Sequence, residues 1–335
     1  MTNMNLAFKQ ILYALVGGMA FFSLAVVTVL SGGLFLISHE GEQAASKNTV
    51  VTVEASGMGA KPPLARPTAA PLLSISAPTP APLWQMIQRV QVPLAPVQAT
   101  AGIVVDDISG NVLMAKNADK PLPMASITKL MTAYITLERG RLMDKIVVSA
   151  KAAATPPTNL PLGEGETLSV NELLTALLLP SANDAAQALA DGLGGEEDFV
   201  RAMNTQASKL GLRHTHFSNP TGFDAAGHAS SAADLATLAH DLFKAHPEVL
   251  PIMQQSHAVL ETTTEHKRYD LQNFHPLITK YAGYMGGKPG FTGDAGNCLL
   301  TLAQRGEKRV IVVVLNSPNA GEESSQLLDA GFATH

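Results

Sequence analysis

The sequence contains little cysteine, no cluster of positive charge and no evident internal repeat. Its single cysteine, Cys298, excludes an intrachain disulfide and a metal site built from several thiolates. The apolar surroundings of Cys298, CLLTLA, predict a packed strand residue. The net charge is -5 and the Lys and Arg residues are dispersed, so nothing in the sequence indicates nucleic-acid binding.

Charge is also missing from the whole run between Ile11 and Ile37. This run is longer than the ~20 apolar residues that cross a bilayer core, and longer than the ~7–15 of a signal peptide. We therefore expect a transmembrane helix over residues 11–37, rather than a signal peptide that is removed. Lys9 precedes the run and Glu40 follows it, so the positive-inside rule places residues 1–10 in the cytoplasm. The rest of the chain is then extracytoplasmic, in the periplasm, on a single-pass anchor in the cytoplasmic membrane.

Residues 38–97 have a different composition, with proline recurring among Ala, Ser and Thr. Such a stretch does not sustain a helix or donate regularly to a sheet, which predicts an extended, semi-rigid linker. The alternative is a recognition segment for a partner, centred on Trp84. A tether between the membrane and a folded domain is the simpler interpretation.

The folded domain is predicted over residues 98–335, with strands at both ends and helices between them. AGIVVDD and VLMAKN form one strand pair, AGNCLLTLAQ and RVIVVVLNS form another, and YAGYMGGKPGFT is strand-like. Five segments within 126–250 carry apolar residues at helix spacing, and SSQLLDAGF predicts a final helix. Ser169 and Glu172 match a capping box, while Gly140 and Gly211 stand where helices end. The fold class is therefore α+β, with one antiparallel sheet of about five strands from both chain ends.

Ser126 and Lys129, in MASITKLMT, share one face of a predicted helix. A serine hydroxyl needs a base to become a good nucleophile, and a lysine whose pKa is lowered by burial can serve as that base. N–H groups at the first helical turn favour the negative charge that develops on an attacked carbonyl. Taken alone, S-x-x-K also fits an ordinary helix N-cap followed by an exposed lysine.

Two further patterns follow in the chain. Ser181 and Asn183 come directly after an apolar run that Pro180 closes, where a turn projects a hydroxyl and an amide; the alternative is an N-cap for the next helix. Lys288 lies in GGKPGFTGDAG, where glycines allow a strand edge to approach a ligand; the alternative is a solvated turn lysine.

These three patterns, in this order, resemble the S-x-x-K, S-D-N and K-T-G motifs of class A β-lactamases and penicillin-binding proteins. The flanking text, including VVDDISGNVLMAKNADKPLPMASITKLMT and THFSNPTGFD, is similar to low-molecular-mass D-alanyl-D-alanine carboxypeptidases and endopeptidases. The resemblance covers about residues 100–332. It implies a β-lactamase/DD-peptidase-like fold that acts on peptidoglycan stem peptides, is covalently inhibited by β-lactam antibiotics, and needs no cofactor or metal.

The resemblance also implies a role for each matching residue. Ser126 attacks the carbonyl of the penultimate D-alanine, Lys129 is its general base, and Ser181 relays a proton to the leaving amine. Asn183 holds the substrate amide, and Lys288 helps to hold the substrate carboxylate. The other substrate-binding residues come from the third motif: Gly290, Phe291, whose N–H shares the oxyanion hole with that of Ser126, and Thr292.

The third motif departs from the family pattern, because Pro289 replaces its threonine. Proline offers neither a hydroxyl nor an N–H for the terminal carboxylate of the substrate. Thr292 lies three residues on, and strand alternation places it on the opposite face from Pro289. We expect catalysis to survive with weaker carboxylate recognition, which shifts the prediction from carboxypeptidase towards endopeptidase. The chain also ends soon after its last predicted strand, without the β-rich domain that many carboxypeptidase-type members carry.

Three alternative functions fit the sequence less well. A class A β-lactamase uses a glutamate to activate its deacylating water, but no Glu lies between Glu197 and Glu248, and Ala182 stands where those enzymes have aspartate. An inactive wall-binding module needs neither a nucleophile nor a base. A metallohydrolase could be drawn from His214, His216, His228 and Asp224, but THFSNPTG is better explained as a packed loop.

Overall fold

The computed structural model describes residues 97–156 and 160–334 of the chain. The predicted anchor, and the predicted linker up to residue 96, lie outside these residues. Within the described part of the chain, no helix is long and apolar enough to cross a membrane.

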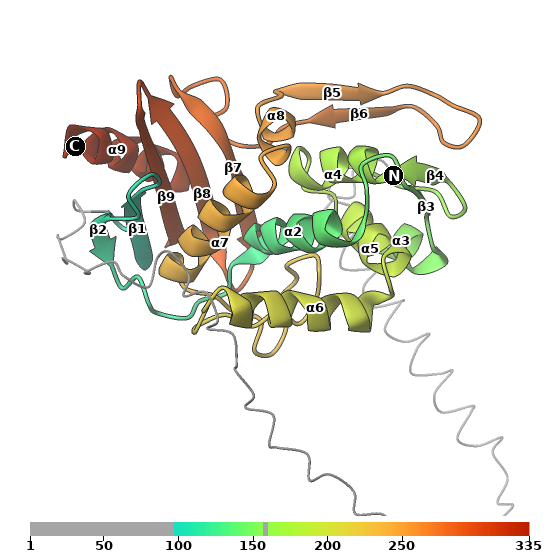
Figure 1. Cartoon of the computed structure of the whole chain (residues 1–335), viewed down its shortest axis with the longest axis horizontal. Helices are drawn as coiled ribbons and strands as arrows, with labels where there is room; N and C mark the ends of the chain where they lie inside the picture. Colours follow the sequence, from blue (N-terminus) through green and yellow to red (C-terminus); the bar gives the residue numbers. More distant parts are fainter. Residues whose placement is uncertain (1–96, 157–159, 335) are drawn as a thin grey trace, which may run out of the picture. The chain divides into compact units, whose positions relative to one another are not determined.

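The domain is built around a five-stranded sheet with the strand order β2-β1-β9-β8-β7. Every neighbouring pair is antiparallel. Its strands come from both ends of the chain: β1 (Ala101–Asp106), β2 (Val112–Lys116), β7 (Tyr284–Thr292), β8 (Gly296–Arg305) and β9 (Lys308–Ser317). The β1–β9 pairing joins the two ends (Figure 1). The predicted antiparallel sheet and α+β class are confirmed.

Strand β9 is apolar at every position from Val310 to Leu315, because both faces of the sheet are covered. Val310, Val312 and Val314 face helix α9 (Ala320–Ala333), which packs on one side of the sheet. The alternate residues of β9 face the other side, where helix α7 (Ala232–Ala245) lies against β1 and β9. The side-chain alternation of a strand thus supplies two cores from one sequence run.

The middle of the chain is helical, as predicted, and forms the helical part of the domain beside the sheet (Figure 1). The short 3-10 helix η2 (Ala125–Thr128) leads directly into α2 (Lys129–Arg139). The other long helices are α4 (Val170–Leu178), α5 (Asn183–Gly192) and α6 (Glu196–Lys209). Smaller elements were not predicted: α3 (Ala150–Ala154), α8 (Val249–Met253), β3 (Lys145–Val147), β4 (Thr167–Ser169), β5 (His257–Leu260) and β6 (Tyr269–Gln272).

The predicted helix ends are mostly found. Ser169 and Glu172 form the expected capping box at the start of α4. Gly211 adopts a left-handed backbone, with φ of 70°, after α6. Gly140 also stands at a helix end, as the C-cap of α2, but it does not adopt the left-handed conformation. Its φ is -127°, and a side chain there would meet Leu193 at 3.2 Å, so packing explains the glycine better than backbone conformation.

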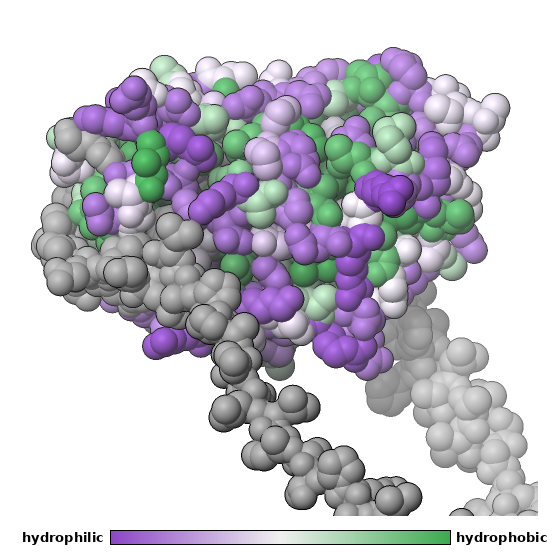
Figure 2. Space-filling model, viewed as in Figure 1, coloured by the Kyte–Doolittle hydropathy of each residue, from purple (hydrophilic) through white to green (hydrophobic). Residues whose placement is uncertain are grey.

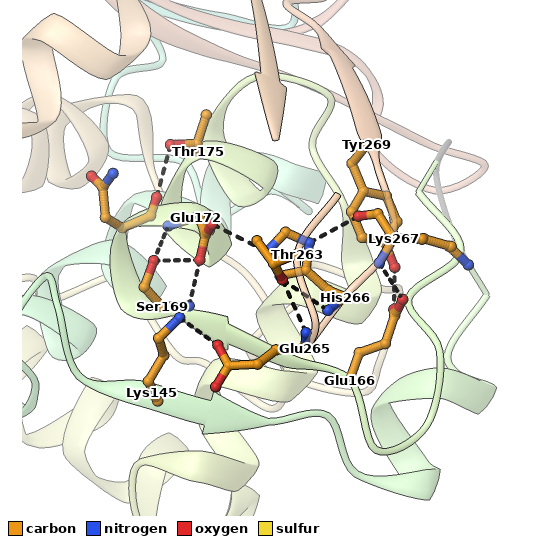
Figure 3. Close-up of polar contacts among 11 residues, drawn as sticks. Lys145, Glu166, Ser169, Glu172, Thr175, Thr263, Glu265, His266, Lys267 and Tyr269 are labelled. Carbon is orange, nitrogen blue, oxygen red and sulfur yellow. Dashed lines mark hydrogen bonds and ion pairs between the residues drawn. The ribbon is translucent and has the colours of Figure 1, made fainter. Parts of the chain in front are cut away.

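The hairpin β5–β6 reaches across the helical half to the small sheet β3–β4. At its tip, the backbone carbonyl of Glu265 accepts a hydrogen bond from Thr167 N (3.1 Å), while its carboxylate pairs with Lys145 (2.9 Å). The buried ring of His266 lies 3.3 Å from the carboxylate of Glu172, and Tyr269 donates to Glu166 (Figure 3). These contacts fix the start of α4, the helix that leads to Ser181.

The side of the domain that Figure 2 shows has a surface of mixed hydropathy. Figure 2 shows hydrophilic and hydrophobic residues interspersed over the described part of the domain. Among the described residues, the large apolar side chains that are most exposed include Phe291 and Phe274. Both belong to the cleft described next.

Candidate active site

Ser126 lies in a strained turn at the entrance of the helical pair η2–α2. The preceding residue, Ala125, has φ of 48°, a left-handed conformation that is costly for a residue with a Cβ. Gly222 packs beneath this turn, and a Cβ on it would come within 2.2 Å of the carbonyl oxygen of Ala125. The loop 218–223 therefore needs glycine at this position to support the turn that carries Ser126.

Lys129 is completely buried one helical turn beyond Ser126. Its Nζ lies 2.9 Å from Ser126 Oγ, 2.7 Å from Asn183 Oδ1 and 2.6 Å from the carbonyl oxygen of Thr221. Burial, and secondarily the charge of Lys288, hold the pKa of Lys129 well below its ordinary value, while the Asp184 carboxylate acts in the opposite direction. A lysine that loses its proton more easily can accept the proton of a neighbouring hydroxyl.

Asn183 is the first residue of α5 and is held at both ends of its amide. Oδ1 accepts from Lys129, and Nδ2 donates to the carbonyl of Pro156 (3.2 Å). The N-cap position belongs to Ala182, without a side-chain cap, so the alternative in which Asn183 or Asp184 caps this helix is wrong. Asp184 instead accepts a hydrogen bond from the backbone of Leu162 (3.0 Å).

Ser181 precedes this helix in a second left-handed turn, with φ of 63°. Ser181 is 6% exposed and lines the same cleft as Ser126. Non-glycine residues with positive φ are uncommon; of the four in the described part of the chain, one lies directly before Ser126 and another is Ser181 itself. Strained backbone of this kind is often found where a side chain must be aimed at a ligand.

Strand β7 forms the opposite wall of the site and is the edge strand of the sheet. Gly290 allows it to lie against η2, because a Cβ there would come within 3.0 Å of Ser126 N and Met124 O. Lys288 is completely buried, and its Nζ donates to the carbonyl of Pro289 (3.2 Å). Burial lowers the pKa of Lys288 to about 7. Because β7 is an edge strand, alternate N–H groups along it lack a strand partner.

The hydroxyl of Thr292 is engaged by other groups of the protein. It donates to Asp224 Oδ1 (2.6 Å) and accepts from Ala295 N (3.1 Å), which fixes the turn between β7 and β8. The neighbouring Phe291 is 69% exposed and lines the cleft. The Thr292 hydroxyl thus points to Asp224, and Thr292 is not among the residues that line the cleft.

A cleft of about 620 Å³ runs between these two walls. Ser126, Ser181, Gly290 and Phe291 line it, while Lys129 and Lys288 are buried behind its surface. The structure thus brings Lys129 into direct contact with both Ser126 and Asn183. Ser181, Gly290 and Phe291 lie around the same cleft. Thr292 is turned to Asp224 and is not part of the lining.

The sequence did not indicate the part played by loop 218–223 in this site. The carbonyl of Thr221 accepts from Lys129, and that of Pro220 accepts from Thr132 (2.6 Å). A backbone carbonyl can come from any residue type, so no sequence pattern identifies these acceptors. The glycine in THFSNPTG was the available indication, because glycine is often found where two backbone segments approach closely.

His228, in this region, is held by protein groups at both ring nitrogens. Nε2 of His228 lies 2.8 Å from the Thr128 hydroxyl, and Nδ1 accepts from Ser218 N (2.9 Å). Burial lowers the pKa of His228 to about 4. Within residues 97–156 and 160–334, no group of three or more His, Cys, Asp or Glu side chains could hold a metal ion.

The comparisons with known proteins decide the family. Residues 86–319 match the model of the peptidase S11 family, described as D-alanyl-D-alanine carboxypeptidase. This chain belongs to that family. It is 35% identical to the D-alanyl-D-alanine carboxypeptidase DacF of Bacillus subtilis over 247 residues, which cover 71% of the chain and 63% of DacF. DacD of Escherichia coli is 33% identical, over 70% of the chain and 63% of that protein. The chain thus spans less than two thirds of the length of these relatives.

Solved structures of related enzymes have the same fold. The structure of a D-alanyl-D-alanine carboxypeptidase from Mycobacterium tuberculosis has a TM-score of 0.68 and 30% identity, covering 73% of this chain and 95% of that one. Penicillin-binding protein D2 from Listeria monocytogenes, solved in its cefotaxime-bound form, has a TM-score of 0.64 and 34% identity, covering 72% and 100%. The β-lactamase/DD-peptidase-like fold that the motifs implied is thereby established.

Proposed function

We propose that this chain is a serine-type D-alanyl-D-alanine peptidase that acts on peptidoglycan stem peptides through an acyl-enzyme on Ser126. The observation that carries the proposal is the contact of Lys129 Nζ with both Ser126 Oγ and Asn183 Oδ1, at 2.9 and 2.7 Å. Nucleophile and base are within proton-transfer distance, and the base has a lowered pKa. The family is one of D-alanyl-D-alanine carboxypeptidases, which supplies the substrate class.

The reaction begins when neutral Lys129 takes the proton of the Ser126 hydroxyl. Oγ then forms a bond to the carbonyl carbon of the penultimate D-alanine, and backbone N–H groups of Ser126 and Phe291 stabilise the oxyanion. The C–N bond breaks, and the proton passes through Ser181 to the leaving amine. Water then attacks the ester, gives one proton to Lys129 or Ser181, and restores the Ser126 hydroxyl as the acid is released.

In this scheme Asn183 both contacts the base, Lys129, and binds the substrate amide. Its Oδ1 is occupied by Lys129, and its Nδ2 is directed to Pro156 O at 3.2 Å. A substrate amide that binds beside Ser126 would offer its carbonyl oxygen to Nδ2 in place of Pro156 O. Lys288 contributes positive charge from its buried position on β7 and lowers the pKa of Lys129 further, so its main role is electrostatic.

The bond that is cleaved distinguishes a carboxypeptidase from an endopeptidase. We favour the endopeptidase reaction on cross-linked stem peptides, because Pro289 removes a carboxylate-binding hydroxyl and Thr292 is held by Asp224. We also propose that residues 11–37 anchor the chain in the cytoplasmic membrane, that residues 38–97 form a tether, and that the domain from residue 98 works in the periplasm.

The proposal is tested by incubating the full chain, in detergent, with purified monomeric and cross-linked muropeptides and identifying the products by mass spectrometry. We expect loss of cross-links, and D-alanine release at a lower rate. A fluorescent penicillin should form an adduct on the Ser126 peptide, and Ser126→Ala should remove it. Absence of both adduct and products would favour an inactive binding module, and rapid nitrocefin turnover would favour a β-lactamase.

A further inference from the structure

The peptide group that joins Ala125 to Ser126 is closely surrounded by other parts of the chain. A Cβ on Gly222 would come within 2.9 Å of Ser126 N, and a Cβ on Gly290 within 3.0 Å of the same atom. The carbonyl oxygen of this peptide group, from Ala125, accepts a hydrogen bond from the Thr128 hydroxyl (2.8 Å). Because a peptide group is planar and trans, the Ala125 carbonyl and the Ser126 N–H point in opposite directions. A contact that fixes the carbonyl therefore also fixes the direction of the N–H.

The Thr128 hydroxyl is in turn held by His228, and both residues are buried. Ser218 N lies 2.9 Å from Nδ1 of His228 and must donate to it, because a backbone N–H has no acceptor capacity. Nδ1 then carries no proton, so the proton of the neutral ring is on Nε2, 2.8 Å from the Thr128 hydroxyl oxygen. Nε2 therefore donates to Thr128, and the hydroxyl proton of Thr128 is directed to the Ala125 carbonyl.

The surroundings of His228 keep its ring neutral. Burial, and secondarily the neighbouring His216, lower the pKa of His228 to about 4, while Asp224 acts in the opposite direction. The ring of Phe217 packs edge-on against the imidazole, with the ring centroids 6.1 Å apart. At neutral pH the imidazole is thus a neutral donor at Nε2 and an acceptor at Nδ1.

We propose that His228 is a positioning residue for the oxyanion hole, acting through the Thr128 hydroxyl and the Ala125 carbonyl. The inference rests on the proposed function, in which the N–H of Ser126 stabilises the oxyanion. Neither Thr128 nor His228 lines the cleft, so both act on the reaction without touching the substrate. Loss of either hydrogen bond frees the Ala125 carbonyl to rotate, and the Ser126 N–H turns away from the oxyanion with it.

Two amide variants separate the roles of the two ring nitrogens of His228. The side-chain amide of glutamine reaches the position of Nε2, and that of asparagine reaches the position of Nδ1. For the full chain in detergent, we expect His228→Gln to be labelled by a fluorescent penicillin at a rate within about threefold of wild type. His228→Asn should be labelled at least about tenfold more slowly. Equal rates for the two variants, or a lower rate for His228→Gln, would overturn the inference.

Stability is the control for these variants. Each of them keeps one hydrogen bond of the ring and loses the other, so their melting temperatures should fall by similar amounts. A purely structural role of His228 predicts that the labelling rates follow the melting temperatures. A positioning role predicts that the rates differ while the melting temperatures do not.

Variants of Thr128 test the next hydrogen bond. Thr128→Val removes the hydroxyl at nearly constant shape and should lower the labelling rate at least about tenfold, whereas Thr128→Ser should stay within about threefold of wild type. Adding His228→Asn to Thr128→Val should lower the rate by no more than about twofold further, because both changes interrupt the same path. Losses that multiply in the double variant would show that His228 acts by another route.

The pH profile distinguishes the oxyanion hole from the base. Thr128→Val should lower the plateau of the labelling rate and leave the acid limb, which Lys129 sets, at the same pH. A displaced limb would show that the variant acts through Lys129, and would overturn the inference.

The tautomer of His228 provides a measurement that does not depend on activity. A long-range ¹H–¹⁵N spectrum of the histidine-labelled full chain at neutral pH should show a neutral ring protonated at Nε2, assigned by its absence from His228→Gln. A ring protonated at Nδ1, or an imidazolium, would overturn the inference. A wild-type chain that forms no penicillin adduct contradicts the proposed function and the inference with it, whereas variants that all match an active wild type contradict the inference alone.

Discussion

The two walls of the cleft each contain a buried lysine, and the lysines differ in their partners. Among the described residues, Lys129 Nζ has three acceptors, from η2, α5 and the loop 218–223. Lys288 Nζ has one, the carbonyl of the next residue, Pro289. The helical wall is thus fixed by long-range hydrogen bonds, while the sheet wall presents apolar side chains to the cleft. The groups that make the covalent bond are preorganised, and those that would hold a substrate carboxylate are sparse.

The largest expected effect comes from removing the base on the helical wall. Lys129→Met keeps the length of the side chain but cannot take the Ser126 proton, so the rate of acylation should fall about a thousandfold. The measurement is the second-order rate of labelling by a fluorescent penicillin. Lys151→Met is the control, because Lys151 is exposed and pairs with Glu196 on the surface. A rate within tenfold of wild type would mean that another group acts as the base.

The pH dependence of acylation should report the same lysine. Only neutral Lys129 can accept the Ser126 proton, so the rate should rise about tenfold per pH unit and level off once pH passes its lowered pKa. The Asp184 carboxylate opposes this lowering, so Asp184→Asn, which keeps an acceptor for Leu162 N, should move the acid limb to lower pH. Labelling rates across the pH range give the limb. A shift to higher pH would contradict the assigned base.

How far the sequence predicts the site depends on the separation of its parts in the chain. Ser126 and Lys129 are one helical turn apart, so their contact follows from local periodicity. The contact of Lys129 with Thr221 spans 92 positions and uses a backbone carbonyl, which no residue pattern encodes. Likewise, the bond from Thr292 to Asp224 depends on tertiary packing across 68 positions. Strand alternation predicted that Thr292 faces away from Pro289, but could not identify its partner.

The same distinction applies to the fold. Long apolar runs and helix-spaced segments predicted the five-stranded sheet and the main helices, because each buries a whole face. The hairpin β5–β6 was not predicted, since its strands are short and Tyr269 and His266 reach partners on distant elements. Burial of Lys288 was equally invisible, because a lysine among glycines is expected to be solvated.

Removing the poorly partnered lysine should stabilise the domain. In the folded chain the pKa of Lys288 is lowered from 10.5 to about 7, so between these values the unfolded chain binds a proton that the folded chain has lost. Stability therefore rises with pH across this window, and Lys288→Met removes the penalty below it. We expect a gain of about 3 kcal/mol at pH 6–7 and a smaller gain at pH 10.

Thermal melting of the variant and wild type at the two pH values measures this difference. Lys129→Met is the comparison, because it also removes a buried charge but leaves Asn183 Oδ1 and Thr221 O without their donor. It should therefore gain less than Lys288→Met. An equal gain at both pH values, or a loss of stability for Lys288→Met, would show that the buried charge is not the cause.

The smallest effect is expected from restoring the motif hydroxyl on the sheet wall. Pro289→Thr supplies an N–H and a hydroxyl at the position where strand β7 borders the cleft, whereas Pro289→Val supplies the N–H and a similar shape alone. We expect the threonine variant to cleave an acyl-D-alanyl-D-alanine with a free carboxylate about three- to tenfold faster than wild type, because one hydrogen bond contributes a net of about 0.7–1.4 kcal/mol. The same peptide with a C-terminal carboxamide should show little change. The valine variant should remain close to wild type. If threonine and valine behave alike, the hydroxyl of the motif is not what limits recognition of a carboxylate.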